Sequence, residues 1–303
     1  MIWLAWRQFR TSALIALAAT AAILVALAAS RSHIVDTYSS SGTGELTGFY
    51  VWLRLLGTVL IGVPAAIGAF WGAPLVASEI EAHTHHLAWT QSVTRPRWLA
   101  TKLLLIAAVC VVSVGLFTAS FTKWSTPIDA VGNRIGTANF GQRVIVPVGY
   151  ALFALTLGTL LGLVIRRTLP AIAATVVAFI AVRITFQQLI RAHLAAPVEI
   201  STPTFGQASL QGWILSSHTV NAAGATISGF ENQIAATCSI TRQTPDYERA
   251  IAECARSLGI HDITRLHPAD HFWTLQYYEF GIFLALAAAL TVACLYAIQR
   301  RPT

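Results

Sequence analysis

Six long stretches that are free, or nearly free, of Asp, Glu, Lys and Arg constrain this chain more than any other feature. A helix needs about 20 mostly apolar residues to cross the hydrocarbon core of a bilayer, because each residue rises only about 1.5 Å. Charged residues make up 11% of the 303 residues, against about 25% in a soluble domain. The stretches cover residues 11–29, 55–78, 103–122, 144–165, 168–190 and 280–299. We therefore predict an all-α membrane protein with six transmembrane helices, forming a single transmembrane domain over residues 1–303.

The distribution of Lys and Arg favours a cytoplasmic location for both termini. With that orientation, nine of these residues flank the spans on the inner side and five lie in the short outer loops. The net charge of +7 is then a consequence of membrane topology, and it requires no nucleic-acid partner. We expect a multi-pass protein of the plasma membrane, in contact with lipid.

Two segments outside the spans have a character of their own. Residues 1–10 place aromatic side chains near helical spacing beside Arg7 and Arg10. They can form an N-terminal interfacial helix, or they can simply anchor the start of the first span. Residues 191–274 are more polar, and in this topology they form an extracytoplasmic lobe between spans 5 and 6.

The second span is unusually rich in glycine and proline. Small residues let helix backbones approach closely, and prolines leave carbonyl groups that neighbouring helices must satisfy. This composition predicts a bent helix packed inside the bundle or at an interface. The residues are Gly57, Gly62, Pro64, Gly68, Gly72 and Pro74.

The four cysteines fall into two pairs. Cys110 and Cys294 lie within spans, where a cysteine usually serves as a small apolar packing residue. Cys238 and Cys254 lie in the segment assigned to the oxidising exterior, 16 positions apart. We predict a disulfide between them.

Polar residues that could bind a ligand are few. Zinc needs three or four convergent ligands, and the His83, His85 and His86 cluster has no cysteine to complete a set, so we predict no metal site. Arg183 is the only charge within a predicted span. It can extend to the outer interface, or it can face a transport pathway. No P-loop sequence for nucleotide phosphates is present.

Residues 70–102 resemble the cytoplasmic loop of ABC exporter permeases of the second type, in particular their actinobacterial branch. The resemblance rests on an acidic pair followed by a threonine, a short hydrophobic run, and a Trp–Lys return to the third span. These motifs are matched by Glu79, Glu81, Thr84, Leu87, Trp89, Arg95, Trp98 and Lys102. The W-x-x-W-R-x-F-R opening and the F-W-x-x-Q-x-x-E entry to the last span extend it to both ends. At one position the pattern differs, because His83 stands where the family has glycine.

The resemblance implies that the spans form half of an export path. The loop after the second span would form a short coupling helix that rests on a separate ABC ATPase subunit. That ATPase would bind ATP and Mg, so this chain would be neither an enzyme nor the holder of a cofactor. Glu79 and Glu81 would suit a helix N-terminus or pair with basic ATPase residues. A second permease chain, giving a homodimer, would enclose the path.

Two other classes of function remain open from the residues. An ion-coupled carrier or channel would act without an ATPase, although such proteins usually place carboxylates or histidines deep in the membrane. A membrane metalloenzyme would use the histidine cluster of residues 83–86.

Overall fold

The computed structural model describes most of the chain. The described residues are 2–41, 51, 57, 60–82, 94–126, 129, 134–202, 212–241, 243–244 and 246–300. The chain divides into two compact units, which we call the helical bundle and the lobe. The bundle comprises Met1–Val131, Ala138–Leu194 and Thr274–Thr303, and the lobe comprises Gly132–Thr137 and Ala195–Trp273. Most of the lobe is therefore inserted in the chain between the fifth and sixth spans.

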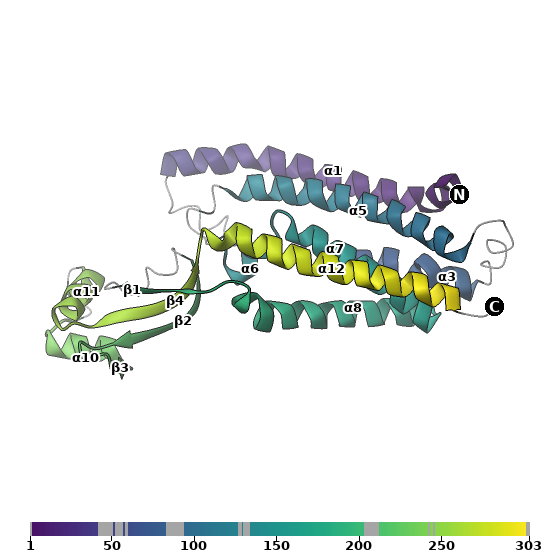
Figure 1. Cartoon of the computed structure of the whole chain (residues 1–303). Coiled ribbons are helices and arrows are strands. Elements are labelled where there is room, and N and C mark those ends of the chain that lie inside the picture. Colours follow the sequence, from purple (N-terminus) through teal and green to yellow (C-terminus); the bar gives the residue numbers. More distant parts are fainter. Residues whose placement is uncertain are drawn as a thin grey trace. The chain divides into compact units, whose positions relative to one another are not determined.

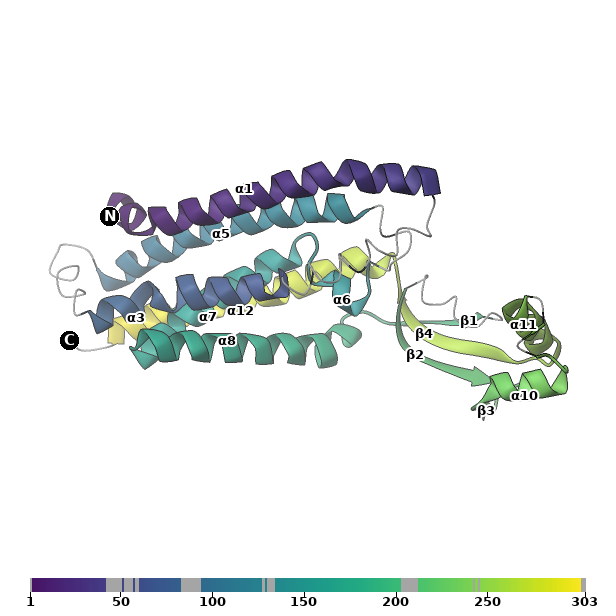
Figure 2. The same ribbon diagram turned by 180° about the vertical axis from the view of Figure 1, so that it is seen from behind.

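Six helices among the described residues are long and apolar enough to cross a membrane (Figure 1). Spans 1 to 6 are Phe9–Ser32, Leu60–Glu81, Arg95–Ser125, Val146–Ile165, Thr168–His193 and His271–Arg300. The predicted number and order of spans are confirmed. In both views the start of the first helix and the end of the last lie at the same end of the bundle (Figures 1 and 2), as an even number of crossings requires.

The bundle is built from long helices with short irregular turns. Its elements are α1 (Ile2–Ser41), η1 (Gly68–Gly72), α3 (Pro74–Glu81), α5 (Arg95–Ser125), α6 (Thr137–Phe140), α7 (Val146–Ile165), α8 (Thr168–Thr185), η3 (Phe186–Ile190), η4 (Arg191–His193) and α12 (His271–Arg300). Helix α1 packs against α5, α5 against α7, and α7 against α8.

For the N-terminal segment two interpretations were open, an interfacial helix or the anchored start of span 1, and the structure shows a segment continuous with span 1. Residues 2–10 continue directly into span 1 as part of α1. The reason lies in the sequence, since residues 2–41 contain no glycine or proline that would interrupt a helix. The expected coupling helix falls on residues 83–93, which lie outside the described part of the chain.

Span 2 is irregular and tightly packed, as its composition predicted. Pro74 has no amide hydrogen to donate, and just before it the chain widens into the π-helical turn η1, where Ala73 N donates to Gly68 O at 2.9 Å. A Cβ atom at Gly158 of α7 would lie 2.2 Å from Gly68 O. The two backbones therefore touch, and only glycine fits at this crossing.

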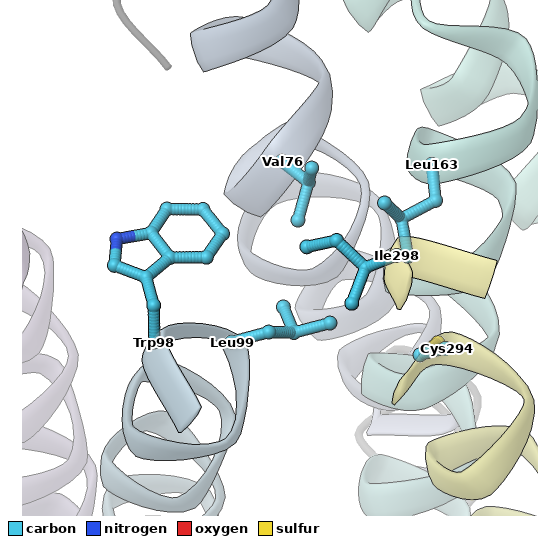
Figure 3. Packing of buried hydrophobic residues seen from close by; sticks show 6 residues of the cluster. All are labelled: Val76, Trp98, Leu99, Leu163, Cys294 and Ile298. Carbon is cyan, nitrogen blue, oxygen red and sulfur yellow. The ribbon is translucent and has the colours of Figure 1, made fainter. Parts of the chain in front are cut away.

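One hydrophobic cluster joins four of the spans (Figure 3). It contains Val76 of α3, Trp98 and Leu99 of α5, Leu163 of α7, and Cys294 and Ile298 of α12. All six side chains are buried. The cluster holds these four spans together at the end of the bundle where span 2 ends.

The lobe contains a sheet, so the all-α prediction is wrong in this part of the chain. Its elements are β1 (Val198–Thr202), β2 (Gly212–Val220), β3 (Thr226–Ile227), α10 (Phe230–Thr237), α11 (Tyr247–Ser257) and β4 (His261–Pro268). The strands are antiparallel in the order β1-β4-β2-β3. A search for long apolar runs misses such strands, because they are short and amphipathic and because β4 pairs with residues far away in the sequence.

The predicted disulfide is present in the lobe. Cys238 follows α10 and Cys254 lies in α11, with Cα atoms 6.4 Å apart. Beneath them Ile234, Ile251 and Ala255 form a small buried core. The bond therefore fastens the two helices of the lobe to each other.

Candidate functional site

Glu79, at the end of span 2 that leads into residues 83–93, is bound to span 3. Its carboxylate accepts a hydrogen bond and ion pair from Lys102 of α5. The Lys102 ammonium also lies 4.4 Å from the centre of the Trp98 ring, which belongs to the buried cluster of Figure 3. The pair is largely buried, with side-chain exposures of 10% for Lys102 and 18% for Glu79. Span 2 and span 3 are therefore joined at this end of the bundle.

Glu81 is bound to span 5 instead. Its Oε2 atom accepts hydrogen bonds from the Thr168 backbone N at 3.0 Å and from Thr168 Oγ1 at 2.7 Å. Thr168 is the first residue of α8, so the carboxylate satisfies one of the unpaired amides there and faces the positive end of the helix dipole. The helix N-terminus that suits this carboxylate thus belongs to the same chain.

The other residues of the predicted coupling loop are described only in part. Thr84, Leu87 and Trp89 lie outside the described residues, as does the histidine cluster of residues 83–86. Arg95 is half-buried at the first position of α5. Within the part of the chain that the structure describes, no group of three or more side chains could hold a metal ion.

Arg183 lies inside the bundle and does not reach its surface, contrary to the interpretation that it extends to the membrane interface. The residue is 6% exposed. Its guanidinium carbon lies 4.1 Å from the centre of the Tyr150 ring, and its Nη1 atom lies 3.8 Å from Oε1 of Glu279. A buried arginine is tolerated in such a place because a carboxylate and an aromatic face compensate its charge.

Glu279 also binds a second arginine. Nε and Nη2 of Arg191 donate to its two oxygens at 2.7 and 2.8 Å, and the Tyr150 hydroxyl donates to it as well. Arg191 Nη2 lies 3.2 Å from that hydroxyl. Tyr150, Arg183, Arg191 and Glu279 form what we call the buried charge cluster. With two cations and one carboxylate, its formal charge is +1.

Sequence reasoning found only part of the buried charge cluster. It placed Arg191 just beyond the fifth span, whereas the structure continues that span to His193. It placed Glu279 at the entry to the last span, whereas α12 begins at His271. The Q-x-x-E pattern at Gln276 and Glu279 was the available signal, since both side chains are fully buried.

A strained turn lies next to the buried charge cluster. Val144 has a φ of 56°, which is rare for a β-branched residue. Its carbonyl accepts from Thr118 Oγ1 at 2.8 Å, and its amide donates to Thr122 Oγ1 at 3.2 Å. Two threonines of α5 thus hold the turn that leads into α7. Nearby, Gly141 leaves space for the Arg183 guanidinium, which a Cβ atom there would meet at 2.2 Å.

Comparison with known proteins agrees with the resemblance seen in the sequence. A family model described as "ABC-2 membrane transporter related" matches residues 13–191, which is more than half of the chain and includes spans 2 to 4 and most of spans 1 and 5. No curated protein and no solved structure matches the chain significantly. The residues that bind one another at the end of span 2, and both arginines of the buried charge cluster, lie within the matched range. The chain therefore belongs to the ABC-2 membrane transporter related family.

Proposed function

We propose that this chain is the permease subunit of an ATP-driven exporter, coupled to a separate ABC ATPase that binds ATP and Mg. The observation that carries the proposal is the pair of contacts made by Glu79 and Glu81. They join the end of span 2 to Lys102 in span 3 and to Thr168 in span 5. A displacement of the following loop, residues 83–93, would therefore reach three spans at once.

The proposed orientation places both termini in the cytoplasm of the cell and the lobe outside the plasma membrane. The excess of Lys and Arg on the inner side supports it. So does the Cys238–Cys254 disulfide, because disulfides persist in oxidising compartments. Two copies of the chain would then pair as a homodimer around the path, as symmetric oligomers commonly do.

Co-purification of the chain with its native ATPases in mild detergent tests the proposal. The wild-type chain is expected to retain an ATPase, and a Glu79→Ala/Glu81→Ala variant is expected to lose it. A matched Lys102→Met/Thr168→Val variant removes the side-chain donors Lys102 Nζ and Thr168 Oγ1 and leaves both carboxylates in place. The backbone amide of residue 168 remains as a donor to Glu81.

The matched pair separates two roles for the carboxylates. Loss in the glutamate variant alone indicates that they contact the ATPase, whereas loss in both variants indicates that they act by holding the spans. Absence of any ATPase from the wild-type chain, together with gradient-driven transport in liposomes, would overturn the proposal in favour of an ion-coupled carrier.

A further inference from the structure

Three cavities follow one another along spans 2 and 3. Span 1 also lines the first two, and spans 4 and 5 line the third. The first, of about 300 Å³, lies beside Glu79 and Lys102. The second, of about 320 Å³, shares the wall formed by Phe70 and Trp71 with the first. The third is a narrow pocket of about 20 Å³ at Arg183. It shares Leu60, Val63, Val114 and Phe117 with the second. Neighbouring cavities thus share lining residues, and we call the three together the groove.

The order of the lining residues shows that the groove runs along the helices. On α5 it passes from Lys102 through Cys110 to Thr118. Sixteen residues of helix correspond to about 24 Å, close to the roughly 30 Å of a bilayer's hydrocarbon core. Span 2 lines it in the opposite direction, from Leu60 to Glu79, as an antiparallel neighbour must.

The groove is apolar in its middle and polar at its ends. The second cavity is lined almost wholly by aliphatic and aromatic side chains, such as Ile23, Ile67 and Phe117. One end carries the ion pair of Glu79 and Lys102. The other end is lined by the polar side chains of Gln142, Tyr150 and Arg183.

Arg183 can accept an anion at its end of the groove. Its side chain is 7% exposed, and within the described residues its Nη1 atom makes no hydrogen bond. The carboxylate of Glu279 already accepts from Arg191 through both oxygens and from Tyr150. Arg183 therefore lines the pocket and has one buried donor, Nη1, that no hydrogen bond to a described residue satisfies and from which an anionic oxygen could accept.

We infer that the groove binds an amphiphile with an apolar chain and one anionic head, a phosphate or a carboxylate, with the head at Arg183. The inference rests on the proposed function, whose substrate class it names. The chain of the ligand lies against spans 1, 2 and 3 in the apolar middle. A cation of the same shape is excluded by the net positive charge of the buried charge cluster.

Photolabelling of the purified full-length chain tests this assignment without any ATPase. The probe is dodecyl phosphate with a diazirine at the end of its chain, used in neutral maltoside detergent. Crosslinks are expected on the apolar residues of spans 1, 2 and 3 and should be displaced by unlabelled dodecyl phosphate. Dodecyltrimethylammonium and inorganic phosphate should not displace the probe.

Two variants distinguish the contact made by the anionic head of the ligand from the contact made by its apolar tail. Arg183→Gln should lower labelling about tenfold, the effect of losing one charge-assisted hydrogen bond. Ala66→Trp, at a partly open wall of the second cavity, should lower it by filling the space for the chain. Lys123→Gln, an exposed position on α5, should leave it unchanged. Protection of the buried Cys110 and Cys294 from maleimide shows that each variant is folded.

The outcomes show whether the ligand is a membrane lipid or a soluble amphiphile. They also test the binding site and the proposed exporter function separately. Displacement by phosphatidylglycerol assigns the site to a lipid headgroup, and resistance to it assigns the site to a soluble amphiphile. Equal displacement by the trimethylammonium compound, or unchanged labelling in Arg183→Gln, would overturn the inference. Specific labelling, combined with gradient-driven transport in liposomes and no ATPase co-purifying with the wild-type chain, would overturn the exporter proposal and leave the binding site standing.

Discussion

Arg191 and Glu279, 88 residues apart in the sequence, form a two-fold salt bridge that is wholly buried. Arg191 lies in the last turn of span 5, just before the chain enters the lobe, and Glu279 lies in span 6 just after the chain returns. The contact thus closes the bundle across the insertion of the lobe. The match to the family model ends at residue 191, so Arg191 lies within the matched range and Glu279 lies outside it.

Replacement of the shared carboxylate should be strongly destabilising. Glu279→Gln leaves Arg191 and Arg183 buried without their counter-charge, and removing one partner of a buried pair costs about 3–5 kcal/mol. The measurement is equilibrium unfolding in detergent, followed by maleimide reaction of the buried Cys110 and Cys294. Lys123→Gln, on the exposed face of α5, should change stability by less than about 0.5 kcal/mol. Equal stability of the two variants would show that the salt bridge does not hold the bundle.

The crossing of span 2 and α7 should be sensitive to a single methyl group. In Gly158→Ala the new Cβ would lie 2.2 Å from Gly68 O, so overpacking should cost about 1–3 kcal/mol. Gly115→Ala in α5 meets nothing within 4 Å, and the better helix former should stabilise the chain by about 0.5–1 kcal/mol. Opposite signs in the same unfolding assay are the expected result, and a shared sign would contradict the close approach.

The turn at Val144 should tolerate glycine. A left-handed conformation costs a residue with a Cβ atom about 1–2 kcal/mol, so Val144→Gly relieves this strain. The glycine also raises the conformational entropy of the unfolded chain, which partly offsets the gain. We expect stability to be unchanged or to rise by up to about 1 kcal/mol. Val146→Gly, two residues on at the buried start of α7, should cost about 2 kcal/mol or more. A large loss in Val144→Gly would show that its side chain, and not its backbone, matters.

The disulfide should stabilise the lobe, and its accessibility to reagents should show on which side of the membrane the lobe lies. Closing the loop between Cys238 and Cys254 is worth about 3 kcal/mol in the chain-entropy model, so Cys238→Ser/Cys254→Ser should make the lobe more susceptible to limited proteolysis. In intact cells, a membrane-impermeant reductant followed by an impermeant maleimide should label both cysteines. Labelling only after the cells are opened would reverse the proposed orientation.

Much of the bundle was predictable because membrane spans are read from composition. A run such as residues 144–165 has no charge over the length of a bilayer, and only a helix satisfies its backbone there. The irregular backbone of span 2 was likewise predictable, since Gly68 and Pro74 act through the backbone itself. The sheet of the lobe was not, because the pairing of β2 with β4 joins residues more than 40 positions apart and leaves no local pattern.

By itself the sequence determined the number of spans, the family resemblance and the pairing of Cys238 with Cys254. These follow from composition, a contiguous motif and a count of cysteines. Only the tertiary structure decided what the charged residues contact. Glu81 binds the start of α8, and Arg183 turns inward to Tyr150 and Glu279. The physical reason is that burying a charge depends on a partner from another helix, and no single stretch of sequence contains both members of such a pair.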